Sequence, residues 1–169
     1  MNGQAGGRQG QIGGWQPPGA TDRKRILDQH RSIAVVGASS NRSRASHFVL
    51  TYLLSRNQYD LYPVNPREDE VLGLRSYPDL ASLPVQPDIV DVFRRSEDLP
   101  AVAEEAVSVG AKVLWVQLGL WSDEAARIAL DAGMEVVMDR CIKIEHARFA
   151  GGLHLAGFDT GVIDSRRER

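Results

Sequence analysis

The residues with the clearest chemical potential follow a short apolar run near the start of the chain. Residues 33–36 are typical of a buried strand, Gly37 comes directly after them, and the small residues 38–40 precede Arg42. Glycine lets the backbone come close to a ligand, and the N–H groups that open the following helix attract an anion. This strand–loop–helix turn therefore predicts a phosphate-binding site.

Arginines recur in the loops that follow the first three predicted strands. A guanidinium group suits phosphate because its planar fork bonds two oxygens at once. The carboxyl ends of parallel strands share one edge of a sheet, so these loops should gather around one ligand. We therefore expect a ligand with several phosphates. The arginines are Arg42 and Arg44 in the first loop, Arg67 in the second, and Arg94 and Arg95 in the third.

Two patterns that would identify a dinucleotide are absent. The fingerprint G-x-G-x-x-G needs further glycines, whereas Gly37 is followed by A-S-S. The acid that would hold a ribose 2′-hydroxyl of NAD is missing from the end of the second strand, because residues 63–67 read P-V-N-P-R and Asp60 lies at the other end. No Gly-Lys-Ser/Thr follows Gly37, so the P-loop pattern fails too. An NAD(P)- or ADP-binding regulator stays as an alternative.

Short apolar strands alternate with helical stretches, which is typical of βαβ units in a parallel sheet covered on both faces. We expect an α/β fold with a single doubly wound, mostly parallel five-stranded sheet in the order 3-2-1-4-5. Its ligand should bind between the first and fourth strands. The expected strands are residues 33–36, 59–64, 89–93, 113–117 and 135–138. The expected helices are a short one begun by Thr21 or Asp22, then 46–56 with Phe48 facing inward, 97–109, 122–132 capped by Ser122, and 142–149.

Composition sets the size and setting of the protein. A chain of 169 residues with 43% hydrophobic content fits one domain, placed at residues 21–149 between flexible tails at 1–20 and 150–169. A net charge of -2 argues against broad nucleic-acid binding. The longest apolar runs are far short of the roughly 20 residues of a membrane span, and no signal peptide is evident. The single cysteine, Cys141, favours a cytoplasmic setting.

Six blocks of sequence, in order, resemble one known family. The chain is similar to the small stand-alone CoA-binding domains, relatives of the nucleotide-binding domain of succinyl-CoA synthetase α subunits and of acyl-CoA synthetases. The blocks are V-V-G-A-S (35–39), Y-P-V-N-P (62–66), L-G-L-R-S-Y-P-D-L (72–80), D-I-V-D-V-F-R (88–94), W-V-Q-L-G (115–119) and D-R-C-I (139–142).

The resemblance implies that coenzyme A or an acyl-CoA is the ligand. Its diphosphate would lie on residues 37–39, its 3′-phosphate end near residues 65–67, and its pantetheine arm along residues 117–119. In the synthetases the basic residue of the second loop lies slightly further along, where Glu68 stands here. A protein partner or a second copy of the chain stays open. The expected cofactor-binding residues are Gly37, Ala38, Ser39, Ser40, Arg42, Asn65, Pro66, Arg67, Phe93, Arg94, Arg95, Gln117, Leu118 and Gly119.

Groups suited to catalysis are few. Synthetases of the related family use a phosphorylated histidine carried by an additional domain, which we do not expect here. None of His30, His47, His146 and His154 stands in the sequence context of that nucleophile.

Cys141 is the remaining candidate for covalent chemistry. It lies near the opening of a helix beside Arg140 and Lys143, a setting that lowers a thiol pKa, although Asp139 opposes this. The sequence shows no paired carboxylates and no metal-ligand spacing. We therefore expect a binding module without a metal, not an enzyme. A CoA-thioester enzyme that uses Cys141 is the alternative.

Overall fold

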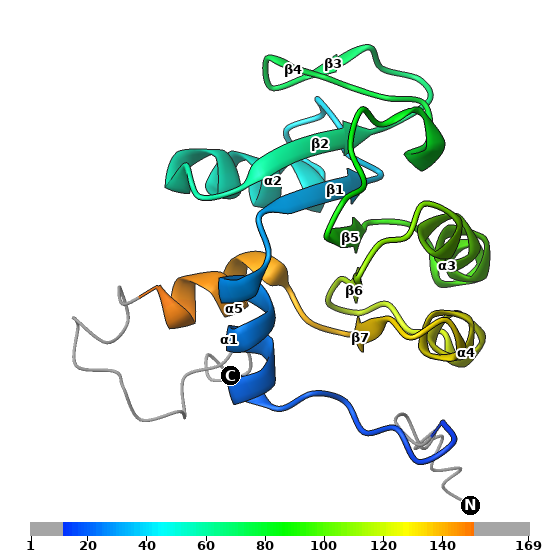
Figure 1. Ribbon diagram of the computed structural model, residues 1–169. Helices are drawn as coiled ribbons and strands as arrows, with labels where there is room; N and C mark the ends of the chain where they lie inside the picture. Colours follow the sequence, from blue (N-terminus) through cyan, green and yellow to red (C-terminus); the bar gives the residue numbers. More distant parts are fainter. Residues whose placement is uncertain (1–11, 151–169) are drawn as a thin grey trace, which may run out of the picture.

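The computed structural model describes residues 12–150 and contains a five-stranded parallel sheet (Figure 1). The sheet confirms the expected α/β class with alternating strands and helices. An antiparallel hairpin, β3 (Glu70–Val71) and β4 (Leu74–Arg75), stands apart from it. The sheet strands are β1 (Ser32–Val36), β2 (Asp60–Val64), β5 (Ile89–Val92), β6 (Val113–Val116) and β7 (Glu135–Val137).

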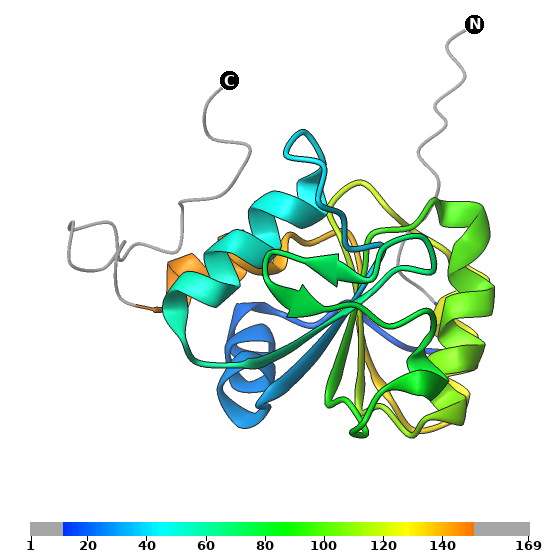
Figure 2. The same ribbon diagram turned by 90° about the horizontal axis from the view of Figure 1, so that it is seen from above.

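Helices cover both faces of the sheet, as Figure 2 shows. One face carries α1 (Ala20–Gln29), α2 (Ala45–Arg56) and α5 (Ile142–Phe149), packed over a core that includes the fully buried Trp115. The other face carries α3 (Leu99–Ser108) and α4 (Asp123–Asp131), packed over Leu114 and its neighbours. Two 3-10 turns, η1 (Leu80–Ser82) and η2 (Ser96–Asp98), complete the described elements.

The predicted strand order was wrong. The structure has the order β2-β1-β5-β6-β7, so the third predicted strand lies beside the first and not beyond the second. Pro63 in β2 has no N–H to donate, which restricts a strand to the edge of a sheet. The residues of β5 are all buried, which suits its place between β1 and β6. The order therefore changes direction between β1 and β5.

Helix boundaries agree with expectation apart from local details. Ser122 caps α4 as predicted, because its hydroxyl accepts the N–H of Ala125 at 3.1 Å. Helix α1 starts after Gly19 without a side-chain cap, so neither Thr21 nor Asp22 has the predicted capping role. Phe48 was predicted to face inward, yet 56% of it is exposed, because Val49, Leu50 and Leu53 form the buried face of α2.

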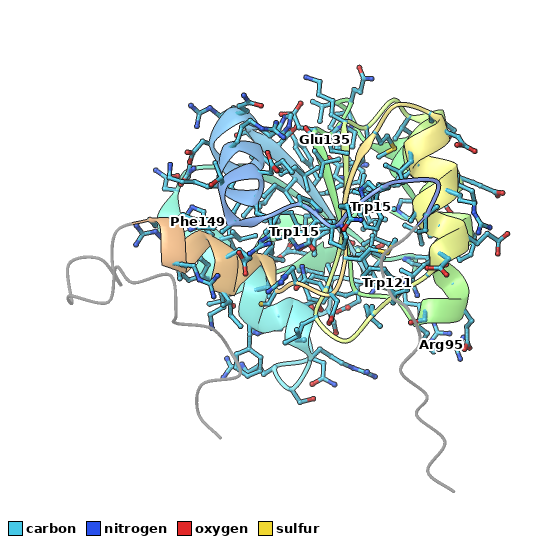
Figure 3. The ribbon with its side chains drawn as sticks, turned by 90° about the horizontal axis from the view of Figure 1, so that it is seen from below. Trp15, Arg95, Trp115, Trp121, Glu135 and Phe149 are labelled. Atoms are coloured by element: carbon cyan, nitrogen blue, oxygen red, sulfur yellow. The ribbon has the colours of Figure 1, made fainter. Side chains whose placement is uncertain are left out.

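The segment before α1 packs against the domain over the residues that the structure describes. Ile12 is buried, and the rings of Trp15 and Trp121 lie 6.2 Å apart between centroids (Figure 3). This differs from the mobile tail expected for Trp15. The rest of that expected tail, residues 1–11, and the tail at 151–169, which includes His154, lie outside the described residues. None of the helices among residues 12–150 is long and apolar enough to span a bilayer.

Candidate functional site

A cleft of about 730 Å³ opens at the carboxyl ends of β1, β2, β5 and β6. In a doubly wound sheet a ligand binds where neighbouring crossovers leave toward opposite faces. Figure 1 shows that α2 follows β1 onto one face of the sheet and α3 follows β5 onto the other. The residues that line the cleft include those directly after β1 and β5, so the cleft lies at this switch point. It is lined by Gly37, Ser39, Arg44, Ala45, Ser46, Asn65, Pro66, Arg67, Glu68, Phe93, Arg94, Arg95, Gln117, Leu118 and Leu120.

Gly37 forms the floor of this cleft because two loops meet there. Its φ of 86° lies in the left-handed region that glycine adopts at little cost. A Cβ on Gly37 would stand 2.5 Å from the carbonyl oxygen of Phe93, which is closer than real Cβ atoms approach. The N–H of Gly37 donates to Val64 at 3.0 Å and the N–H of Phe93 donates to Val36 at 2.8 Å. Glycine at this position therefore lets the loop after β1 contact both the end of β2 and the loop after β5.

Helix α2 begins at the edge of the cleft. Arg44 is its N-cap, in extended conformation, and no side chain caps the helix. Ala45 and Ser46, in the first turn, both line the cleft. The first N–H groups of a helix lack partners within it and carry a partial positive charge, so this end can bind an anion.

Three arginines of the cleft have side chains that pair with no described residue. Arg44, Arg67 and Arg94 line it, and no hydrogen bond or ion pair joins their guanidinium groups to residues 12–150. Arg95 also lines the cleft, but its guanidinium pairs with Glu97 at 2.9 Å and with Asp98 at 3.3 Å. The cleft thus holds three positive charges free to bind an anionic ligand.

A carboxylate that was not among the predicted site residues lines the same cleft as these arginines. Both oxygens of Glu68 accept the N–H of Ser40, at 3.1 and 3.2 Å. The side-chain amide of Asn65 donates to Glu68 at 3.0 Å and to the carbonyl of Ala38 at 2.8 Å. Glu68 therefore joins the loop after β2 to the loop after β1. Its place three residues beyond Asn65, on a loop already assigned to the site, was the available signal.

A second unpredicted acid lies beneath the cleft. Asp91 in β5 is fully buried, and the side-chain amide of Gln117 donates to its Oδ1, while Oδ2 has no partner among the described residues. Burial raises the pKa of Asp91 to about 8, against a smaller lowering by the Gln117 hydrogen bond. Asp91 thereby fixes the amide of Gln117, which lines the cleft. One charged residue inside an otherwise apolar strand was the sequence signal.

The raised pKa of Asp91 predicts a pH-dependent stability. An unfolded aspartate ionises near pH 3.8. Between pH 3.8 and about 8 the native state therefore keeps a proton on Asp91 that the unfolded chain has lost. The stabilisation from this proton is complete below 3.8 and is lost as the pH rises to about 8. Asp91→Asn cannot ionise, so urea unfolding should show the variant gaining about 5 kcal/mol on the wild type between pH 4.5 and pH 8.5.

The exposed Asp131→Asn is the matched control, since it removes the same charge from the surface of α4. An equal pH trend in both variants would contradict the assignment to Asp91.

The loop after β6 places Leu118 in the cleft and turns Gly119 away from it. Leu118 is 52% exposed, and Gly119, with a φ of 84°, is absent from the lining. The N–H of Gly119 donates to the carboxylate of Asp139 at 2.7 Å. Asp139 itself has a left-handed φ of 56°. Gly119 is thus a turn residue that lets Leu118 project.

The structure brings most of the predicted site residues to the cleft and leaves four out. Ala38 is fully buried, and Ser40, Arg42 and Gly119 do not line the cavity. The predicted residues that line it are Gly37, Ser39, Asn65, Pro66, Arg67, Phe93, Arg94, Arg95, Gln117 and Leu118. The lining residues outside the predicted set are Arg44, Ala45, Ser46, Glu68 and Leu120.

Cys141 lies outside the cleft lining, and its place before a helix does not lower the pKa of its thiol, which weakens the alternative of a Cys141-dependent enzyme. Burial raises the pKa of the Cys141 thiol, and the N–H groups of Ile144 and Lys143 offset this only in part. His30 is the C-cap of α1, and His47 in the first turn of α2 does not line the cleft. Among residues 12–150, no three or more His, Cys, Asp or Glu side chains are grouped to hold a metal ion.

Comparisons with known proteins agree with one another. A family model described as a CoA binding domain matches residues 31–147. The uncharacterized protein YneT of Bacillus subtilis is 43% identical over 132 residues, which cover 78% of this chain and 97% of that protein. An ADP-forming acetate–CoA ligase II of Archaeoglobus fulgidus is 29% identical over 105 residues, covering 61% of this chain and 16% of the ligase.

Solved structures of small proteins share this fold over most of the chain. A hypothetical protein from Pyrococcus horikoshii has a TM-score of 0.77 and 37% identity, over 80% of this chain and 97% of that one. A protein from Thermus thermophilus has a TM-score of 0.73 and 34% identity, over 78% of this chain and 99% of that one.

Proposed function

Because the chain belongs to the CoA-binding domain family, we propose that it binds coenzyme A or an acyl-CoA in the cleft, as a binding module without catalysis. The observation that carries this proposal is the cleft's cationic lining. Three guanidinium groups that pair with none of residues 12–150 line this cleft together with the start of α2 and the Gly37 turn. CoA carries a diphosphate and a 3′-phosphate, and several cations in one cleft suit a ligand with that many charges.

The pose follows from the chemistry of each part of the cleft. The diphosphate lies over Gly37 and the first turn of α2, where main-chain N–H groups and Arg94 bind its oxygens. The adenosine lies near Asn65–Arg67, beside Glu68. The pantetheine arm passes Gln117, whose amide suits its amides, and Leu118, which supplies an apolar wall.

Calorimetric titration with CoA, acetyl-CoA, NAD and ADP tests the proposal. We expect both CoA species to bind and to displace ADP, with NAD weaker. Protein purified from cells should also release CoA species on denaturation, seen by mass spectrometry. Failure of CoA and acetyl-CoA to bind at millimolar concentration would remove the proposal. Release of free thiol from acetyl-CoA at a catalytic rate would contradict the non-catalytic part.

Arg94→Ala is expected to weaken CoA binding by about 1.5–3 kcal/mol, because its unpaired guanidinium then no longer bonds a phosphate. Calorimetry on the wild type and the variant measures the difference. Arg31→Ala is the matched control, since Arg31 is exposed at the amino end of β1, the opposite edge of the sheet. Equal losses of affinity in the two variants would show that Arg94 acts only through the net charge of the protein and not through a bond to a phosphate.

One observation favours a second candidate. Glu68 places a carboxylate at the cleft near the end of β2, where the sequence was thought to lack an acid that could hold a ribose hydroxyl. An ADP- or NAD-binding regulator therefore keeps support from the site itself. Competition of CoA against NAD in the same titration separates the two candidates.

A further inference from the structure

We propose that Arg67 and Glu68 act together as a reader of the ribose in the bound nucleotide. Arg67 binds a phosphate on one ribose carbon, and Glu68 accepts a hydrogen bond from the free hydroxyl on the neighbouring carbon. With CoA as the ligand, the pair selects a 3′-phosphate beside a free 2′-hydroxyl. This inference rests on the proposed function and adds a specificity determinant to it.

The first support is that Glu68 has capacity left for a ligand. It lines the cleft, its oxygens accept only the N–H of Ser40 and the amide of Asn65, and no cation among residues 12–150 pairs with it. A carboxylate offers about four lone-pair sites. Donors from the protein leave part of this capacity unused, so a ligand hydroxyl can be bound without breaking either contact.

The second support is that the two side chains start from one rigid frame. The Oδ1 of Asn65 accepts the N–H of Arg67 at 2.8 Å, and the amide of the same side chain holds both Glu68 and the carbonyl of Ala38. Asn65 thereby fixes the backbone of Arg67 and the carboxylate of Glu68, so the cation and the anion start from consecutive, ordered residues. Both line the cleft within the loop that follows β2.

The third step is the chemistry that such a pair recognises. A phosphate next to Glu68 would place two negative charges together, which is unfavourable, whereas a hydroxyl donates to it. A phosphate next to Arg67 is favourable. Neighbouring groups of opposite charge therefore match a ribose that carries one phosphate and one free hydroxyl on adjacent carbons. They disfavour the isomer with these groups exchanged.

The test uses nucleotides that lack the pantetheine arm. Calorimetry measures the binding of 3′,5′-ADP, 2′,5′-ADP and ADP to the wild type, Glu68→Gln and Glu70→Gln. We expect the wild type to prefer 3′,5′-ADP to 2′,5′-ADP by at least about tenfold, the effect of one misplaced charge. Glu68→Gln should lower this ratio by about fivefold or more, chiefly by strengthening 2′,5′-ADP, because the amide keeps an acceptor oxygen but loses the charge.

Glu70→Gln is the matched control, since Glu70 lies exposed in β3 close along the same loop and its carboxylate makes no hydrogen bond or ion pair with the described residues. It should leave the isomer ratio unchanged. A purely structural role of Glu68 would weaken both isomers alike, and an unchanged ratio overturns the inference. If CoA binds but the wild type treats the isomers equally, the inference falls while the proposed function stands. If neither CoA nor any of the three nucleotides binds, both fall.

Discussion

Gly37→Ala should destabilise the whole domain, and not merely obstruct the cleft. A Cβ at this position would stand 2.5 Å from a backbone oxygen of Phe93, at a φ of 86°. A left-handed alanine costs about 1–2 kcal/mol, and separating two central strands adds to this, so we expect a loss of about 3 kcal/mol or more.

The measurement is urea unfolding followed by circular dichroism, and the chain provides a close control. Gly119 has a nearly equal φ of 84°, yet a Cβ there would meet nothing within 4 Å. Gly119→Ala should therefore show the left-handed cost alone, about 1–2 kcal/mol. The difference between the variants isolates the contact with Phe93. Equal losses would mean that the loops after β1 and β5 separate at little cost.

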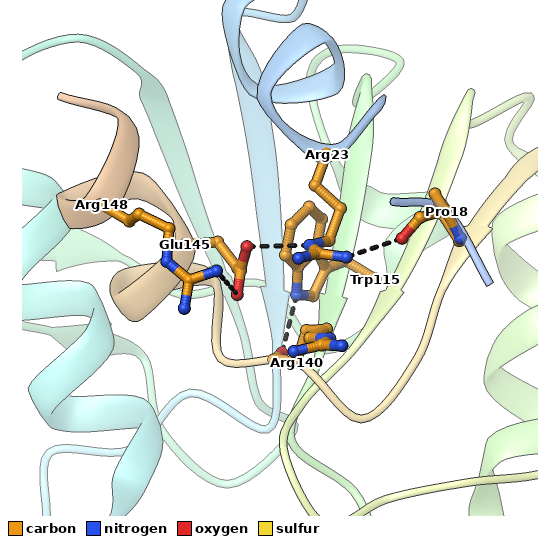
Figure 4. A network of polar contacts seen from close by, with 6 residues as sticks. All are labelled: Pro18, Arg23, Trp115, Arg140, Glu145 and Arg148. Carbon is orange, nitrogen blue, oxygen red and sulfur yellow. Dashed lines mark hydrogen bonds and ion pairs between the residues drawn. The ribbon is translucent and has the colours of Figure 1, made fainter. Parts of the chain in front are cut away.

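Glu145→Ala should be about as damaging, although it lies away from the cleft. Figure 4 shows Arg23 of α1 between Glu145 of α5 and the carbonyl of Pro18. The Nε of Arg23 donates to Glu145 at 2.8 Å, and its Nη1 donates to the carbonyl of Pro18 at 2.7 Å. The side chains of Arg23 and Glu145 are only 6% and 3% exposed. Removing the carboxylate leaves Arg23 as a buried charge without its anion, which costs about 3–5 kcal/mol.

Chemical denaturation at pH 7 compares this variant with Asp28→Ala. Asp28 pairs with Lys24 at 2.6 Å, but both side chains are about half exposed, so its loss should cost less than about 1 kcal/mol. The double variant Arg23→Met with Glu145→Leu should recover much of the stability, because Arg23 no longer leaves a buried charge without its anion. Arg148, which pairs with Glu145 at 3.9 Å, loses that contact equally in the single and the double variant. A Glu145→Ala loss as small as that of Asp28→Ala would show that water reaches Arg23.

Local sequence patterns predicted the elements of this fold, because they depend on neighbouring residues. The apolar runs marked the five strands, and Ser122 marked the start of α4. The order of the strands depends on which of them has neighbours on both sides, and no local pattern states that. Pro63 carried the missing information, since a strand without that N–H belongs at an edge.

The residues of the candidate site, like the elements of the fold, were predictable from the sequence only in part. Residues on loops at the carboxyl ends of strands could be assigned from their place after the strands together with the family resemblance, and Asn65, Phe93 and Gln117 all line the cleft. Glu68 and Asp91 could not, because their roles depend on partners distant in sequence: Ser40 for Glu68 and Gln117 for Asp91. Burial of Asp91 is a property of the packed sheet, and it also determines the pKa of that carboxyl.

The position of β1 inside the sheet has a consequence for how the protein meets its ligand. Both neighbours of β1 hold the glycine turn: the carbonyl of Val64 in β2 accepts the N–H of Gly37, and Phe93, directly after β5, donates its N–H to the carbonyl of Val36. The crevice above it arises where the chain leaves β1 and β5 toward opposite faces of the sheet. We therefore expect a largely preorganised cleft, in which little of the binding free energy is spent on ordering a loop.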